Sequence, residues 1–144
     1  MTSSTAQLNE LIEITRDGKE FYDHARDEVK DVRFKALFAD MSQAKNEVIQ
    51  ALAAKVIADH EQPSASGTFV GKMRQAYANV RAALSSDEEA AYVIQLEEAE
   101  DRILHAFQDA LESAEPDVRA LLVMEMPKVR ACHDRMRSVK QTIK

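Results

Sequence analysis

The chain has 144 residues, with 25 acidic and 19 basic side chains, a net charge of −6 and one cysteine, Cys132. This length suits a single domain over residues 1–144, and the acidic balance argues against a nucleic-acid binder, which needs a basic face. The polar segment Met1–Gln7 carries no secretory signal, no apolar run approaches the length of a membrane span, and a lone cysteine suits a reducing compartment. We therefore expect a cytoplasmic protein that does not enter membranes.

Helical spacing of apolar residues runs along nearly the whole chain, and strand signals are almost absent. The first predicted helix covers Thr5–Val29, behind Ser4-Thr5-Ala6-Gln7, which is typical of a capping box. Gly18 in its middle predicts close approach by a neighbouring helix, because glycine is otherwise unfavourable there. The second predicted helix covers Val32–His60, with Asp31 as its N-cap.

The second half of the chain repeats this layout after a break. Glu61–Gly67 is expected to be a loop, and a shorter helix over Thr68–Leu84 follows it. A third long helix should start at Ser85-Ser86-Asp87 and end near Ser113, and the last should run from Pro116 to the C-terminus.

Two antiparallel pairs of long helices, joined by a connection long enough to span their length, define one architecture. We predict an all-α, ferritin-like up-down four-helix bundle with a long helical crossover between the second and third long helices.

Several segments of the chain resemble a known family. They are LIEITRDGKEFY, LFADMSQAKNEVIQAL, SGTFVGKMRQAYANVRAAL, LEEAEDRILHAFQDAL and VRACHDRMRSVK. The most telling residues are Asp17-Gly18 with Glu20 and Tyr22, the run Glu97–Asp101, and His133-Asp134-Arg135. In order and spacing these segments are similar to a bacterial family of ferritin-like bundles of unknown function. The resemblance implies a four-helix ferritin-like fold and is compatible with a stress or housekeeping role, but it implies no established activity.

Charged residues fall on faces where a bundle needs apolar side chains. At about 100° per residue, Glu100 lies at the centre of the apolar stripe of its helix, and Glu97 lies on the same face. Glu125 and His133 fall on the core stripe of the last helix. A buried carboxylate must be paired, protonated or bound to a metal, because an unpaired buried charge is very costly.

Antiparallel pairing of the last two helices indicates which charges can meet. With the turn centred near residues 114–115, Glu97 lies level with His133, and Glu100 lies level with Arg130. The same construction puts Lys45 in a middle layer near Glu100. We therefore predict a buried polar network in which Glu100 pairs with Lys45 or Arg130, and Glu97 pairs with His133.

A metal centre is the competing interpretation. A di-iron or di-manganese site needs one Glu from each of two helices and Glu-x-x-His from each of the other two. The corresponding positions here are Thr15, Lys45-x-x-Val48 and Arg130-x-x-His133, so cations replace ligands. We expect a degenerate centre in a non-catalytic bundle without a cofactor, which acts by binding or assembly. The alternative is a site for iron or manganese formed by Glu97, Glu100 and His133.

Three further features have simpler interpretations. Cys132 is expected to be a small core residue rather than a nucleophile. A solvated acidic face is predicted for Glu13, Asp17, Glu20 and His24. A helical adaptor, or a bundle that associates with a second copy, would use the face around Phe69, Met73 and Tyr77.

Overall fold

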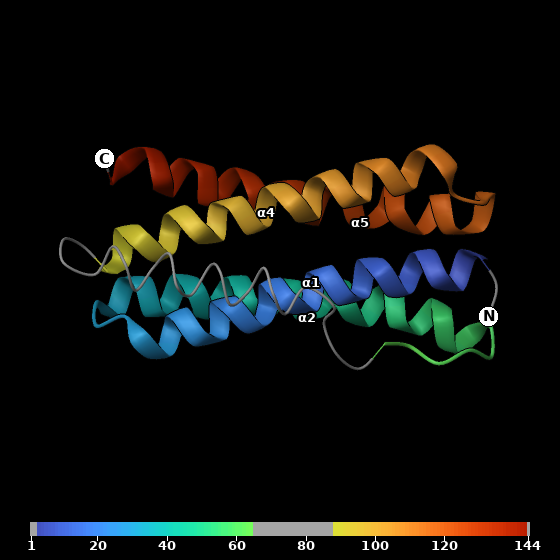
Figure 1. The fold of residues 1–144 in the computed structure, drawn as a ribbon, viewed down its shortest axis with the longest axis horizontal. Helices are drawn as coiled ribbons and strands as arrows, with labels where there is room; N and C mark the ends of the chain where they lie inside the picture. The colour runs from blue at the N-terminus through green and yellow to red at the C-terminus, as the bar shows by residue number, and fades with distance from the viewer. Residues whose placement is uncertain (1–2, 65–87, 144) are drawn as a thin grey trace.

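The computed structural model describes residues 3–64 and 88–143, and over these ranges the chain is all-helical, with no strand (Figure 1). Four helices carry the fold: α1 (Ser3–Glu28), α2 (Val32–Ala58), α4 (Glu88–Ser113) and α5 (Pro116–Thr142). Each has 26 or 27 residues, which corresponds to about 40 Å of helix. The helix predicted over Thr68–Leu84 and the cap at Ser86 lie outside the described residues.

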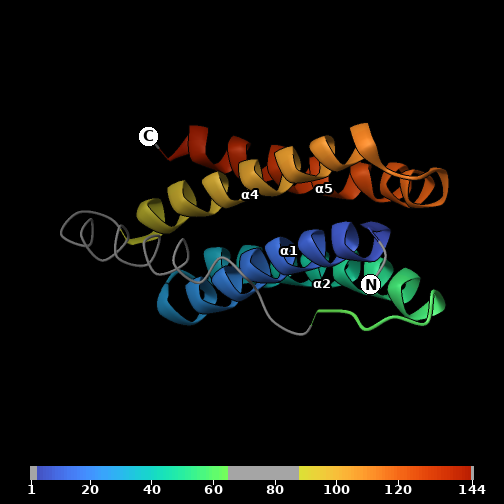
Figure 2. The same ribbon diagram turned by 45° about the vertical axis from the view of Figure 1, so that its right-hand side comes forward.

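The four helices pack as two antiparallel pairs laid side by side, as both views show (Figures 1 and 2). Helix α1 packs against α2 and α4, and α5 packs against α4 and α2. Each helix therefore contacts two neighbours and buries a wide arc of its surface. Helices α2 and α4 run in the same direction, so α2 ends and α4 begins at opposite ends of the bundle (Figure 1).

Helix ends follow the local chemistry at two of the three predicted positions that can be examined. Asp31 caps α2 by accepting a hydrogen bond from the Arg33 backbone N–H at 2.8 Å, and Pro116 begins α5, so both predictions are confirmed. The predicted capping box at Ser4–Gln7 is wrong. Helix α1 already begins at Ser3, and the Gln7 side chain instead donates to the Ala110 carbonyl of α4 at 3.3 Å.

The chain beyond α2 is fastened to α1 by a buried asparagine. The Asn9 amide donates to the Gln62 carbonyl at 3.2 Å, and its oxygen accepts from the Ser64 backbone N–H at 2.9 Å. The Ser64 hydroxyl also bonds the Glu13 carboxylate at 2.9 Å. These contacts direct the chain back along α1 after α2 ends.

The apolar core consists of two clusters, one in each half of the bundle. One contains Leu8, Ile12, Ile49, Leu52, Ile103, Phe107 and Leu122, among others. The other contains Phe21, Tyr22, Phe38, Met41, Val93, Leu96 and Met136, among others. Between them every helix passes through a short stretch that belongs to neither cluster, and in this middle layer the buried polar residues Thr15, Lys45 and Glu100 lie.

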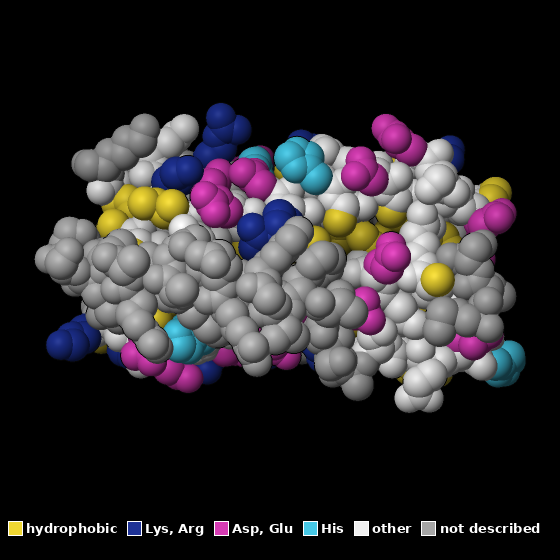
Figure 3. All heavy atoms as spheres, in the orientation of Figure 1, with side chains coloured by type: hydrophobic (Ala, Val, Ile, Leu, Met, Phe, Trp, Pro, Cys, Tyr) yellow, Lys and Arg dark blue, Asp and Glu magenta, His cyan; other side chains and the backbone are white. Residues whose placement is uncertain are grey.

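Charged side chains lie on the described part of the bundle face that Figure 3 draws. On the described part of the face in Figure 3, acidic and basic side chains lie interspersed, and apolar side chains gather in a band between them. Among the described helices, none combines the length and the apolar composition that crossing a membrane would require.

Gly18 provides a test of helix packing in the middle layer. A Cβ atom at this position would lie 2.8 Å from the Ile103 Cδ1 atom of α4, which confirms the predicted close approach. Gly18→Ala made in an Ile103→Val background should raise the free energy of unfolding by up to about 1 kcal/mol, because the clashing methyl is gone and alanine favours the helix. In the wild-type background, where Ile103 Cδ1 is present, Gly18→Ala should raise the free energy of unfolding less, or lower it. Urea denaturation of the four proteins measures the difference, and equal effects of Gly18→Ala in both backgrounds would refute the packing.

Candidate functional site

The middle layer contains a buried ion pair between α2 and α4. Lys45 Nζ donates to Glu100 Oε1 at 2.5 Å, and the two side chains are 1% and 0% exposed. The Tyr22 hydroxyl of α1 donates to Glu100 Oε2, also at 2.5 Å. Both oxygens of the Glu100 carboxylate therefore have a protein donor, and one carboxylate ties three helices together.

The environment keeps Tyr22 in its neutral, donating form. Burial raises the pKa of Tyr22 well above its usual value, and the negative charge of Glu100 and the hydrogen bond to it raise the pKa further. The phenol thus stays protonated, as a donor to a carboxylate must. Helical spacing does not reveal this role, because the Tyr22 ring fits an apolar helix face, although a buried tyrosine hydroxyl usually needs a partner.

Cys132 of α5 borders the same layer. Burial raises the pKa of the Cys132 thiol, and the nearby Lys45 ammonium offsets only part of that rise. A thiol with a raised pKa carries little thiolate at neutral pH, so it is a poor nucleophile. This matches the expected core role, and Cys132 belongs to the buried cluster around Met136.

Arg130 does not take part in this network. The sequence left two cations open as partners of Glu100, and the structure places Lys45 there while Arg130 is exposed on α5. Antiparallel pairing predicts how far along the bundle a residue lies, but it does not predict which way the helix is rotated about its axis and so which side chains face the interior. Arg130 follows the buried Val129 and precedes the buried Cys132, so it projects outwards between two core positions.

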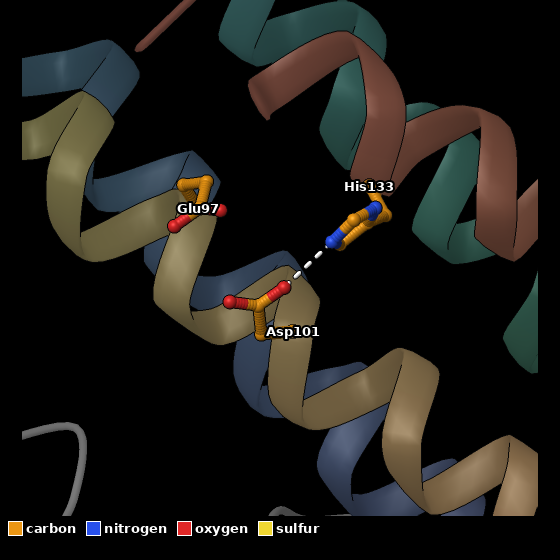
Figure 4. Close-up of side chains that lie close together, drawn as sticks. All are labelled: Glu97, Asp101 and His133. Carbon is orange, nitrogen blue, oxygen red and sulfur yellow. Dashed lines mark hydrogen bonds and ion pairs between the residues drawn. The ribbon is translucent and has the colours of Figure 1, made fainter. Parts of the chain in front are cut away.

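A second polar cluster lies where α4 and α5 meet. It consists of Glu97, Asp101 and His133 (Figure 4), with Lys140 and Asp134 in contact with Glu97 and His133 respectively. His133 Nε2 contacts Asp101 Oδ1 at 2.6 Å, and His133 Nδ1 contacts Asp134 Oδ1 at 3.0 Å. Lys140 Nζ donates to Glu97 Oε1 at 3.2 Å. We refer to these five residues as the α4–α5 cluster.

The α4–α5 cluster corrects two sequence predictions. Glu97 pairs with Lys140 rather than with His133, and His133 pairs with Asp101, one helical turn further along α4 than Glu97. Glu100 does not join Glu97 and His133 in a common site, because its oxygens face Lys45 and Tyr22. The sequence prediction includes neither Asp101 nor Lys140 in the network, although Asp101 stands four residues after Glu97 and therefore shares its helix face.

The hydrogen bonds of His133 outweigh its desolvation. Burial acts to lower the pKa of His133, but the bonds to Asp134 and Asp101 and their negative charges raise it above its usual value. His133 is thus held between two carboxylates, one on each ring nitrogen.

The acidic face predicted on α1 is not fully solvated. Asp17 is buried and His24 is half-buried, with its Nε2 atom 3.0 Å from the Tyr92 hydroxyl of α4. Helix α1 packs against both α2 and α4, so the buried arc extends beyond the apolar stripe on which the prediction was based. The Phe69, Met73 and Tyr77 face lies outside the described residues and stays a prediction.

Over residues 3–64 and 88–143 these features define the class of the protein: four long helices packed as a bundle, with a buried ion pair in the middle layer. A family model, described as a domain of unknown function (DUF2383), matches residues 3–113. The chain therefore belongs to this family. No curated protein and no solved structure matches it.

Removing one partner of the buried ion pair should be costly. Lys45→Met should lower the free energy of unfolding by about 3–5 kcal/mol, because it leaves the Glu100 carboxylate without its ammonium. The double variant Lys45→Met/Glu100→Gln should recover most of that loss, since neither charge is then buried. Urea denaturation followed by circular dichroism measures both. If Lys45→Met and Glu100→Gln each cost little, or if their costs simply add, the two groups are not coupled as described.

Proposed function

We propose that this protein is a ferritin-like four-helix bundle whose interior metal position is replaced by the Lys45–Glu100 ion pair. It acts by binding or assembly in the bacterial cytoplasm and not by metal-dependent oxidation. The resemblance of its sequence segments supports the ferritin-like and bacterial parts of this proposal. The parallel course of α2 and α4, which ferritin-like folds share, is compatible with it.

The single observation that carries the proposal is the Lys45 ammonium in contact with Glu100. A carboxylate-bridged metal pair needs several carboxylates and imidazoles that converge on the bundle interior. Here α2 contributes a positive charge at that level, and Tyr22 occupies the second oxygen of Glu100. The hydroxyl of Thr15 donates to the Leu11 carbonyl of its own helix at 2.7 Å. These residues do not fit an interior iron or manganese pair.

Oxidation of ferrous iron tests this directly. The purified protein should oxidise Fe²⁺ in air no faster than the Lys45→Met/Glu100→Gln variant does, because in our proposal the Lys45 ammonium takes the place of an interior metal ion. Absorbance of ferric products in the near ultraviolet follows the rate. Oxidation that the wild type accelerates and the double variant does not would overturn the proposal.

Assembly is supported by an apolar surface near the start of α5. Val123 and Met124 are exposed, Met124 at 73%. Val123 also lines a shallow groove together with Ala114, Pro116, Arg119 and Ala120. Exposed apolar groups that adjoin a groove are typical of contact surfaces, and a second copy of the chain is the partner we propose.

Light scattering on the purified chain tests the assembly. We expect a mass above that of one 16.2 kDa chain, and Met124→Glu should reduce it towards the monomer, because a charge would then be buried in the contact. Val32→Glu is the matched control, since Val32 is 74% exposed, as Met124 is at 73%, but belongs to the start of α2, at the opposite end of the bundle from the start of α5 (Figure 1). A monomeric wild type, or equal effects of the two variants, would exclude this surface.

A further inference from the structure

We infer that Glu97, Asp101 and His133 form a binding site for one divalent first-row transition-metal ion at the contact between α4 and α5. One donor atom from each residue lies within 4.8 Å of the other two. This site does not include the Lys45–Glu100 pair. It differs from the iron or manganese site that the sequence suggested as an alternative, because Asp101 takes the place of Glu100. It does not depend on the function proposed for the bundle.

The positions of Glu97, Asp101 and His133 on their helices bring the donor atoms of the three side chains close together. Glu97 and Asp101 are four residues apart on α4, so their side chains lie one above the other on the same face. His133 approaches from α5 with its Nε2 atom towards them (Figure 4). All three residues stand on regular helices, which position ligands more precisely than loops do.

The ligand types select the class of metal. Imidazole nitrogen suits zinc, iron, copper and nickel, whereas Mg²⁺ and Ca²⁺ prefer oxygen ligands alone. Around a tetrahedral ion with bonds of about 2.0–2.2 Å, two ligand atoms lie about 3.3–3.6 Å apart. The present spread of up to 4.8 Å therefore has to contract by about 1.2–1.5 Å, and the 2.6 Å contact between His133 and Asp101 has to open by about 0.7–1.0 Å, so the three side chains turn when the ion binds.

Asp134 gives His133 the orientation that such a site requires. Histidines that bind metals usually donate their other ring N–H to a carboxylate, which fixes the tautomer and the ring orientation. His133 Nδ1 lies 3.0 Å from Asp134 Oδ1, and this leaves Nε2 to face Glu97 and Asp101. The ring is thus oriented with Nε2 towards the site, and an ion that binds there takes the place of the Nε2 proton shared with Asp101, which is released to solvent.

The charges of the α4–α5 cluster also favour a cation. Glu97, Asp101 and Asp134 contribute three carboxylates, and Lys140 contributes one ammonium. When the imidazole is neutral, as a metal ligand must be, these residues carry an excess of two negative charges. A divalent ion balances that excess.

The site is accessible from solvent. The Asp101 side chain is 41% exposed, so an ion can enter beside it and keep water molecules as further ligands. Lys140 contacts Glu97 through a partly exposed side chain, which can turn into solvent when the metal binds. In our account Lys140 competes with the metal for Glu97.

Calorimetric titration of the metal-free protein with Zn²⁺, and in parallel with Mn²⁺ and Mg²⁺, tests the inference. We expect one Zn²⁺ per chain and no heat of binding with Mg²⁺. Asp101→Asn and His133→Gln should each weaken Zn²⁺ binding at least tenfold, Asp134→Asn should weaken it about 10–100-fold, and Lys140→Met should strengthen it. Circular dichroism verifies that each variant is folded, and the half-exposed Asp101 gives a variant that disturbs the core least.

Two controls make the result decisive. His105→Gln removes an exposed histidine from α4, the helix that carries Glu97 and Asp101, and should leave Zn²⁺ binding unchanged. Lys45→Met/Glu100→Gln should also leave it unchanged, because the interior pair is not part of the site. Absence of Zn²⁺ binding, or binding that Asp101→Asn and His133→Gln do not affect, would overturn the inference. Loss of binding in the interior variant alone would overturn both the inference and the function proposed above.

Discussion

The Glu100 carboxylate lies in the middle of the bundle, where water cannot reach it, and the surrounding structure has to compensate for its charge. Removing a carboxylate from water costs several kcal/mol, which only a close cation and well-placed donors can offset. Lys45 supplies the cation and Tyr22 the second donor. Because these three residues come from α2, α1 and α4, one carboxylate fixes the relative register of three helices. The buried charges of this middle layer also explain why the apolar core is divided into two clusters, one on either side of the layer.

Two glutamates only three residues apart have different environments. Glu100 faces the interior, where its partners are buried and cannot move away without leaving a charge unpaired. Glu97 faces the contact with α5, where its partner Lys140 is partly exposed and can leave for solvent. Interior charges in this bundle therefore have a structural role, whereas the charges at the α4–α5 contact remain able to exchange partners. This difference separates the ion pair that holds the helices from the cluster that can accept a ligand.

Much of the fold follows from the sequence, because helix signals are local. The Asp31 cap and the first-turn proline Pro116 act within one turn of the helix end, and both predictions hold. The cap predicted at Ser4–Gln7 fails because Gln7 finds a tertiary partner on α4. Tertiary partners of this kind leave no signal in a local pattern.

The polar sites were predictable in part. The level of Glu100 along the bundle, and Lys45 as one of its two candidate partners, follow from helical spacing. Which of Lys45 and Arg130 reaches Glu100 depends on how each helix is rotated about its own axis. His133 pairs with Asp101 instead of the predicted Glu97 because α4 and α5 are shifted by one turn relative to the predicted alignment. Spacing within each helix does not determine the shift between two helices. Tyr22 was missed for another reason: its ring fits an apolar stripe, and only the position of Glu100 shows what its hydroxyl binds.

The most direct test of the central ion pair is a crystal structure of the protein grown with saturating Mn²⁺, with anomalous scattering recorded near the manganese edge. Our account predicts no anomalous peak beside Glu100, with the Lys45 ammonium in contact with its carboxylate. A manganese peak on the Glu100 oxygens, with Lys45 turned away, would contradict it.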